Sequence, residues 1–401
     1  MNFNPAGRVE SSVIASRPMS VEDIFIPVLG MTGAGKTTFI STCTQEKPLQ
    51  SGRGLSSCTS QVTLHTMTYN GRTVHLIDTP GFNGTHRSDG ETLQELAFWL
   101  IGAFQRELRI SGIVYLHQIT APRLEGSSLR GLNAFKALCG EESYPGIALA
   151  TTRWDEVDED EGALRQQELC SKAHFWGDLK KGGCHITKLS VGRPSALKLI
   201  QHIVKQDHRL ILRLQRQMIH ENKLIHETDL GQVVYCKALA DQEALDRLMA
   251  EAKCDFEKAA SEFHDRRIIA SRNAMAGIST ELSKKKSELS NLQIDMESLQ
   301  TIWDKKICEE LEELRRKSEE NAVRHRKKTE ELERLRQSPL YSQSVEHRYE
   351  DEFREIEKER NEIEVVRRQK IGARNHTSIS TVVGTGLALG QFIAMLACTV
   401  M

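Results

Sequence analysis

The chain has 401 residues, 39% of them hydrophobic, and a formal net charge of −1 at pH 7. This composition suffices for one full domain core plus an extended part, and the balanced charge argues against nucleic-acid binding, which requires a net positive face. The nine cysteines form no CxxC pair and no His/Cys cluster at metal spacing, which predicts reduced cytosolic thiols and argues against structural zinc. Residues 1–20 lack the apolar core of a signal peptide and are expected to be disordered.

The first predicted element is a buried strand at Phe25–Leu29, which runs directly into a glycine-rich loop and a helix start. Residues 30–37 fit the phosphate-loop pattern GxxxxGK followed by Ser or Thr at every fixed position. Glycines allow successive backbone N–H groups to face phosphate oxygens, and the helix N-terminus adds partial positive charge. We expect Lys36 to reach the β- and γ-phosphates and the Thr37 hydroxyl to hold Mg²⁺. The residues predicted to bind nucleotide in this loop are Gly30, Met31, Thr32, Gly33, Ala34, Gly35, Lys36, Thr37 and Thr38.

Two further loops are expected to complete the metal and γ-phosphate site. Residues 56–60 carry several hydroxyls, and one of them should coordinate Mg²⁺ when the γ-phosphate is present. Thr59 is the predicted ligand, with Ser60 as the alternative. Asp78-Thr79-Pro80-Gly81 follows an apolar run as a DxxG motif. Its aspartate should hold Mg²⁺ through a water, and its last N–H can approach the γ-phosphate because glycine has no side chain.

A third motif follows the predicted strand Ile147–Thr151 and concerns the base. Thr151-Thr152-Arg153-Trp154-Asp155 is a variant of the (N/T)KxD motif that recognises guanine. Asp155 is expected to accept hydrogen bonds from guanine N1 and N2, and Arg153 can lie on the base face as lysine usually does. A fifth motif, which would contact guanine O6, stays open between residues 185–190 and Ser195-Ala196.

Strands alternate with helices over the first half of the chain, which predicts an α/β fold: a doubly wound, mainly parallel P-loop NTPase sheet of six strands. Asn70-Gly71 is a strong hairpin signal, so the second and third strands should pair antiparallel. The predicted strands are Phe25–Leu29, Gln61–Tyr69, Thr73–Asp78, Ile113–Gln118, Ile147–Thr151 and Cys184–Leu189. The predicted helices between them are Leu93–Phe104, Leu129–Leu138, Ala163–Leu179 and Ala196–Val204. The nucleotide is then expected at the carboxyl ends of the strands.

Together the motifs GMTGAGKTT, SCTS, LIDTPGF and TTRWD resemble the GTPases of the immunity-associated nucleotide-binding family, which is close to septins and chloroplast-import receptor GTPases. Gly112–His117 and Leu132–Gly140 resemble an extra box of that family, and the motif wording is nearest to fungal G-domain proteins. The resemblance spans Glu22–Lys205. It implies binding of GTP and GDP with Mg²⁺, slow hydrolysis, and a homo-dimer or oligomer formed through the G domain.

The chain gives its own reason to expect slow hydrolysis. Ras-type GTPases place a glutamine just after DxxG to orient the attacking water, and this chain has Phe82 there. Lys36 and Thr59 are the side chains expected to act on the γ-phosphate, and further help must come from elsewhere, most naturally from a second subunit. Candidate donors are Arg87, Arg123 and Arg130, although an ordinary surface role is the more frequent one for arginine.

From residue 237 to about residue 370 the composition is that of long helices, with Gly277 as the only glycine and Pro339 as the only proline. Ser338-Pro339 is expected to end one helix. A seam with alternating spacings of three and four indicates a coiled coil and comprises Leu289, Leu292, Met296, Leu299 and Trp303. The sequence leaves open whether these helices fold back on each other as a solvated hairpin or pair with a partner chain.

Residues 379–400 contain no charged residue and, as a helix, would be about 33 Å long, enough to cross a bilayer core. Arg367, Arg368, Lys370 and Arg374 precede them, which favours a cytosolic position for that side. This predicts a cytoplasmic protein with a tail anchor in an intracellular membrane; the alternative is an apolar helix that docks on protein.

These observations predict a GTP-binding switch protein that hydrolyses GTP slowly to GDP and phosphate with help from assembly, and whose self-association is gated by nucleotide. Two alternatives stay open. One is a non-catalytic scaffold that GTP stabilises and that acts through its coiled coil. The other is a phosphate-loop kinase or ATPase, against which Asp155 argues. The predicted divisions are residues 1–20, 21–210 for the G domain, 211–370 for the helical extension and 371–401 for the hydrophobic segment.

Overall fold

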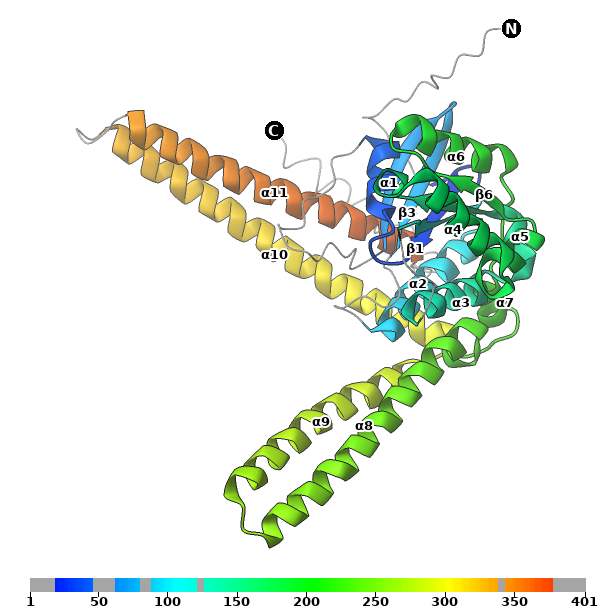
Figure 1. The fold of residues 1–401 in the computed structure, drawn as a ribbon. Coiled ribbons are helices and arrows are strands. Elements are labelled where there is room, and N and C mark those ends of the chain that lie inside the picture. The colour runs from blue at the N-terminus through cyan, green and yellow to red at the C-terminus, as the bar shows by residue number, and fades with distance from the viewer. Residues whose placement is uncertain (1–18, 46–61, 80–87, 121–125, 338–342, 378–401) are drawn as a thin grey trace. The chain divides into compact units, whose positions relative to one another are not determined.

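The computed structural model describes residues 19–45, 62–79, 88–120, 126–337 and 343–377. Its contacts divide the chain into two units, Met1–Leu299 and Gln300–Met401. The first unit holds a mixed sheet with its covering helices and one helical hairpin, and the second holds most of another pair of helices (Figure 1). The predicted division at residue 210 stays a prediction.

Within the described residues six strands form one sheet in the order β2-β3-β1-β4-β5-β6. They are β1 (Ile24–Gly30), β2 (Thr63–Tyr69), β3 (Arg72–Asp78), β4 (Ile113–Gln118), β5 (Ile147–Thr152) and β6 (His185–Lys188). β2 pairs antiparallel with β3 and the other pairs are parallel, which confirms the predicted fold class. Asn70 and Gly71, both with positive φ, form the two-residue turn of the predicted hairpin.

Helices cover both faces of the sheet, as a doubly wound fold requires. One face packs against α1 (Lys36–Thr44) and α6 (Arg193–Gln206), and inward residues of β1, β3 and β4 share a buried cluster with those helices. On the other face the Tyr115 ring packs on Phe135 of α3 (Ser127–Cys139), with 4.4 Å between ring centroids. Within α2 (Asp89–Gln105) the run from Thr92 to Ala103 is buried without a break, so other elements surround this part of the helix on every side.

One predicted helix is divided in the structure. Residues 163–179 were expected to form a single helix, and they belong instead to α4 (Glu159–Ser171), the π-helical turn η4 (Ala173–Gly177) and α5 (Asp178–Lys181). Phe175 has non-helical φ and ψ of −96° and −116°, and a Cβ at Gly177 would lie only 2.8 Å from backbone atoms of Lys172. The chain therefore turns too tightly here for a continuous helix. The shorter elements elsewhere are η2 (Glu141–Gly146), η3 (Trp154–Glu156), α7 (Arg213–Ile219) and η5 (Ile225–Glu227).

The first helical hairpin consists of α8 (Asp229–Ser261) and α9 (Asp265–Asn291). It contacts the first turn of α2, where Lys237 pairs with Asp89 at 2.7 Å and Glu288 accepts a hydrogen bond from the Gly90 N–H at 3.2 Å. The hairpin therefore contacts the sheet-containing part of its unit at the helix that follows the DxxG motif.

The predicted seam from Leu289 to Trp303 does not lie in one helix. α9 ends at Asn291 and α10 (Met296–Arg336) begins after a break, so the seam residues fall on two different helices. At this break the Leu292 and Ile294 carbonyls accept hydrogen bonds from the backbone N–H groups of His226 and Ile225, both at 3.0 Å. These carbonyls bond to the segment before α8, at the point where the helical hydrogen-bond pattern is interrupted.

The second unit contains all of α11 (Gln343–Thr377) and all but the first residues of α10, and the two helices run antiparallel. Asn321, only 3% exposed, donates to the Ile356 carbonyl at 3.2 Å, and Lys328 pairs with Glu352 at 2.9 Å. α10 ends at Arg336, before Pro339 as predicted. The helices thus fold back on each other within the chain, which is the hairpin alternative; pairing with another chain stays untested.

No helix among the described residues is long and apolar enough to span a bilayer. The predicted anchor at residues 379–400 lies outside the described residues.

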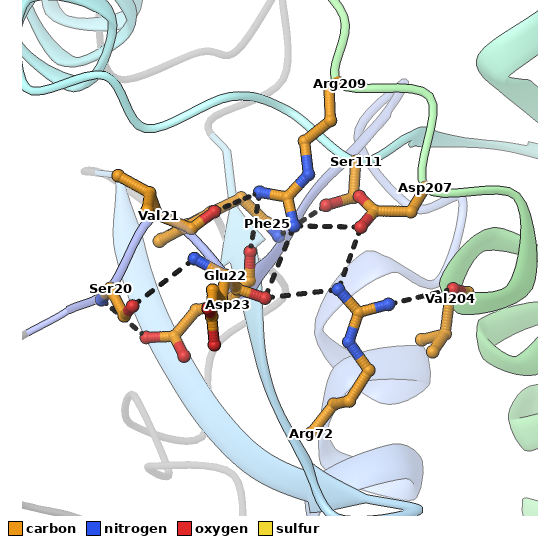
Figure 2. A network of polar contacts seen from close by, with 10 residues as sticks. All are labelled: Ser20, Val21, Glu22, Asp23, Phe25, Arg72, Ser111, Val204, Asp207 and Arg209. Carbon is orange, nitrogen blue, oxygen red and sulfur yellow. Dashed lines mark hydrogen bonds and ion pairs between the residues drawn. The ribbon is translucent and has the colours of Figure 1, made fainter.

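A polar network ties together the amino ends of the strands (Figure 2). Asp207, which follows α6, pairs with Arg72 at the start of β3 and with Arg209, both at 2.8 Å. The two guanidinium groups also donate to backbone carbonyls just before β1, including that of Glu22 at 3.1 Å and 3.3 Å. Burial alone would raise the pKa of Asp207, but hydrogen bonds from Arg72, Ser111 and Arg209 outweigh it and hold that pKa below its ordinary value.

Candidate functional site

The phosphate-loop residues lie at the carboxyl end of β1, beside β3 on one side and β4 on the other. Gly30, Gly33 and Gly35 have φ of 142°, 84° and 90°, a region that favours glycine. At Gly30 a Cβ would also lie 2.3 Å from the Leu116 carbonyl oxygen, so no other residue fits the approach to β4. The loop then enters α1 at Lys36, which gives the strand–loop–helix order that an anion site at a helix N-terminus needs.

Lys36 is placed by the loop itself. It is only 8% exposed, and its ammonium group donates to the Gly30 carbonyl at 3.0 Å and to the Met31 carbonyl at 3.2 Å. These two hydrogen bonds orient the ammonium group toward the glycine loop. This is the position from which a lysine can meet phosphate oxygens.

Two of the predicted metal ligands meet directly. The Thr37 hydroxyl, in the first turn of α1, donates to Asp78 Oδ2 at the end of β3 over 2.9 Å. Asp78 is 2% exposed, and the neighbouring Thr79 hydroxyl fastens this end of β3 to β1 by donating to the Val28 carbonyl at 2.9 Å. A hydroxyl and a carboxylate at this spacing offer the oxygen ligands that Mg²⁺ prefers.

The base loop lies against the phosphate loop. The Thr152 hydroxyl donates to the Ala34 carbonyl at 3.0 Å, and the Arg153 guanidinium donates to the Gly33 carbonyl at 3.2 Å. Arg153 has a left-handed backbone with φ of 61°, and the next residues form the short helix η3, which leaves Asp155 exposed. The two hydrogen bonds join residues that are 118 and 120 positions apart in the sequence. The phosphate loop and the base motif are therefore in direct contact, as a shared ligand would require.

The two candidates for the fifth motif lie on either side of one short loop, at the end of β6 and in the first turn of α6. β6 ends at Lys188, the Leu189 N–H donates to the Thr151 carbonyl at 2.9 Å, and the Ser190 N–H donates to the Ser195 hydroxyl at 3.0 Å. The loop is thus attached to the end of the strand that carries the base motif. The sequence alone could not decide between the two candidates, because Ser and Ala residues are common in loops.

Sequence reasoning missed Glu95. This residue of α2 is 8% exposed, and its carboxylate accepts a hydrogen bond from the Val62 N–H at 2.8 Å, where the chain enters β2. The helix after the DxxG motif and the strand after the predicted switch residues 56–60 are therefore joined. A buried glutamate in an apolar helical pattern was the only available signal.

Several predicted site residues lie outside the described residues: Thr59, Ser60, Gly81, Phe82, Arg87 and Arg123. Arg130 is described and lies exposed on α3. The switch parts of the site stay predictions.

His117 is buried near this edge of the sheet, at 6% exposure in β4, and its ring meets Trp176 edge-on with 5.8 Å between centroids. Burial lowers the pKa of His117 to about 4. The imidazole is therefore neutral at physiological pH and adds no charge beside the phosphate loop.

Residues 25–123 match the family model described as 50S ribosome-binding GTPase. Among solved structures, Toc33 from Arabidopsis thaliana in complex with Mg²⁺ and GMPPNP is similar at 16% identity and a TM-score of 0.38, over 48% of this chain and 88% of that chain. Elongation factor SelB from Methanococcus maripaludis is similar at 14% identity and a TM-score of 0.32, over 49% of this chain and 36% of that chain. No curated protein sequence matches the chain.

The class of the protein follows from the fold, the phosphate-loop geometry and the matched family model together. The first half of the chain contains a GTP-binding GTPase domain of the P-loop type.

Proposed function

We propose that the chain is a GTP-binding switch of the immunity-associated nucleotide-binding type, which hydrolyses GTP slowly and self-associates through its G domain in a nucleotide-dependent way. The single observation that supports this most is the contact between Thr37 and Asp78 at 2.9 Å beside the carbonyl-held Lys36. Three separate sequence motifs place hydroxyl, carboxylate and ammonium groups at one edge of the sheet, where a Mg-bound nucleotide triphosphate would need all three.

In this proposal the base is guanine. Asp155 accepts the N1 and N2 hydrogens of guanine, and Arg153 covers the base face while its guanidinium donates to the Gly33 carbonyl at 3.2 Å. The loop Leu189–Arg193 supplies backbone N–H groups to guanine O6. Adenine offers no donor at the corresponding positions, so a kinase or ATPase function is disfavoured.

Thr37, Thr59 and Asp78 would hold Mg²⁺, whose charge lowers the barrier to γ-phosphate transfer when the ion is bound. Lys36 and the backbone N–H groups of residues 30–38 orient the triphosphate and stabilise the charge that develops on its oxygens. When the γ-phosphate is present, Thr59 and Gly81 close on it, and the ordered loops form the surface that a second G domain recognises.

Slow hydrolysis is expected because Phe82 cannot orient a water as the usual glutamine does. A second subunit is then the natural source of a catalytic group, and Arg87, Arg123 and Arg130 are the candidates. The alternative function is a non-catalytic scaffold that GTP stabilises. The contacts of Lys237 and Glu288 with α2 support the scaffold alternative. They connect the helical hairpin to the helix that follows the DxxG motif, so nucleotide binding could act on the helical part.

The test is GTP turnover per subunit as the protein concentration rises, with Mg²⁺ present and with Lys36→Ala as the control. A rate that climbs with concentration and disappears in the control supports the assembly-assisted GTPase. A flat rate near zero despite tight GTP binding would instead support the scaffold. Absence of GTP binding would contradict both.

A further inference from the structure

Trp154 stands between the two residues of the base motif, Arg153 and Asp155, and its side chain points back to the sheet. The indole N–H donates to the Thr151 carbonyl at 3.1 Å and to the Thr151 hydroxyl at 3.0 Å. Both acceptors belong to Thr151, the penultimate residue of β5. The indole therefore attaches the base loop to the end of the strand that precedes this loop. Trp154 occupies the variable position x of the (N/T)KxD pattern, and in this chain its side chain attaches the loop to β5.

Helix α4 is shaped to receive this ring. Gly162 lies in the first turns of α4, and a Cβ on it would be 2.6 Å from Trp154 Cζ3 and 3.0 Å from Cε3. The backbone of Gly162 has ordinary helical geometry and does not need glycine for its conformation. Glycine is required here because the indole ring takes the space of a side chain.

Lys188 is a second neighbour of the ring. Its ammonium group lies 4.1 Å from the centre of the Trp154 ring, and it also pairs with Glu159 at the start of α4 over 2.7 Å. This places the cation within the range of a cation–π contact. The indole thus joins three elements: the end of β5, the start of α4 and the end of β6.

The loop that carries this anchor is conformationally demanding. Arg153 has a left-handed backbone with φ of 61°, a conformation that is uncommon for residues with a side chain. Arg153 is held on one side by the Gly33 carbonyl at 3.2 Å and by Glu156 at 3.2 Å. Trp154 is the following residue, so its anchoring fixes the direction in which the backbone delivers Asp155.

We propose that Trp154, seated on Gly162 and covered by Lys188, is the positioning residue that sets guanine selectivity in this domain. It acts through Asp155 and touches neither phosphate nor metal. The proposal rests on the proposed role of Asp155 as the guanine-reading residue. It assigns a selectivity role to three residues outside the nucleotide-contacting positions of the motifs.

The experiment compares the affinities of the full chain for Mg-GTP and Mg-ATP by competition against a fluorescent guanine nucleotide. Trp154→Ala should weaken GTP binding about tenfold or more and leave ATP binding unchanged, because misplacing Asp155 costs only base recognition. Trp154→Phe keeps the ring over Gly162 and under Lys188 but loses the indole N–H, so an intermediate loss is expected. Equal weakening of GTP and ATP would overturn the proposal, since it would indicate general damage to the domain.

Gly162→Ala provides a second variant that keeps every side chain of the base motif. The added methyl group should displace the indole and lower the GTP-to-ATP affinity ratio, whereas it should have no further effect in the Trp154→Ala chain, where no ring is present. This non-additivity is the signature of a shared mechanism. Gly277→Ala is the matched control, because it is also a helical glycine and its Cβ would meet nothing within 4 Å.

Additive effects of Gly162→Ala and Trp154→Ala would contradict the contact between the ring and the glycine.

Asp155→Asn separates this proposal from the function on which it rests. If Asp155→Asn leaves the GTP-to-ATP ratio intact, the assignment of the base site is wrong. If Asp155→Asn lowers the ratio and neither Trp154→Ala nor Gly162→Ala does, only the positioning role fails. A shift in the Trp154 emission when GTP binds, absent in Trp154→Phe, is the expected spectroscopic sign.

Discussion

The two ends of the central sheet both carry cationic side chains that are fixed by hydrogen bonds, and the partners of these side chains differ. At the amino ends, Arg72 and Arg209 are paired with the carboxylate of Asp207 at 2.8 Å. At the carboxyl ends, Lys36 donates to the carbonyls of Gly30 and Met31. Arg72 and Arg209 tie separate chain segments together through one shared carboxylate, whereas the Lys36 ammonium is oriented by carbonyls of its own loop. We infer that the first arrangement serves stability and that the second orients a cation for the proposed ligand.

The largest effect is expected at the carboxyl end. Lys36→Ala should weaken GTP binding by about 100-fold or more, because a charge-assisted contact to two phosphates is lost. The free energy of unfolding should change by less than about 1 kcal/mol, since the lost hydrogen bonds go to carbonyls of the half-buried loop residues Gly30 and Met31. Calorimetric titration with Mg-GTP and urea unfolding of the same preparation measure both. A stability loss that exceeds the binding loss would erase the contrast between the two ends.

The next effect sharpens the same comparison at the base loop. Asp155→Asn should lower GTP affinity about tenfold to 100-fold and raise affinity for xanthosine triphosphate, because the amide presents a donor where guanine requires an acceptor. Competition between the two nucleotides is the measurement. Unfolding in urea should be unaltered, because Asp155 is exposed.

The reverse outcome is expected at the amino ends. Asp207→Ala should reduce the free energy of unfolding by about 1–3 kcal/mol, because it leaves two partly buried guanidinium groups without their shared carboxylate. GTP affinity should stay within about twofold, since the network lies at the opposite edge from the phosphate loop. Arg72→Ala, which removes one partner only, should cost less. A marked loss of GTP affinity in Asp207→Ala would show that the two ends are coupled.

The smallest effect concerns the pH dependence of stability. His117 and Asp207, at opposite ends of the sheet, should contribute to it in different pH ranges. The pKa of His117 is lowered to about 4 by burial, so the unfolded chain binds the proton more readily. Its contribution to stability is full above pH 6.5, the ordinary pKa, and is lost as the pH falls toward about 4. Asp207, whose pKa is held below its ordinary value, contributes above about pH 3.9 and loses its contribution only in stronger acid. His117→Phe should flatten stability between pH 6.5 and pH 5 and leave the decline in stronger acid, as urea midpoints across pH can report.

Much of the fold could be predicted because its signals are local. The Gly30 to Thr37 pattern, the Asn70-Gly71 turn and the apolar runs each specify one element without reference to the rest of the chain. The same holds for the contact between Thr37 and Asp78, since both residues end strands or begin helices at the same edge of a parallel sheet.

What could not be predicted depends on distant partners. Arg72 and Asp207 are 135 residues apart, and no periodic pattern in either segment predicts their pairing. The seam from Leu289 to Trp303 keeps its spacing across the break before α10, because spacing does not report where backbone carbonyls find partners outside the helix. Trp154 occupies a variable motif position, and its meaning appears only when Gly162 and Lys188 are placed beside it.

The hairpin of α8 and α9 leaves and rejoins the body of its unit at one place. Ile225 and His226, just before it, bond to Ile294 and Leu292, just after it. The two attachment points are therefore hydrogen-bonded neighbours whatever the length of the helices between them. We expect that whole helical turns can be added to both arms beyond the contacts of Lys237 and Glu288 with α2 without disturbing the sheet. The reach of this arm is thus a dimension that mutation can tune independently of nucleotide binding.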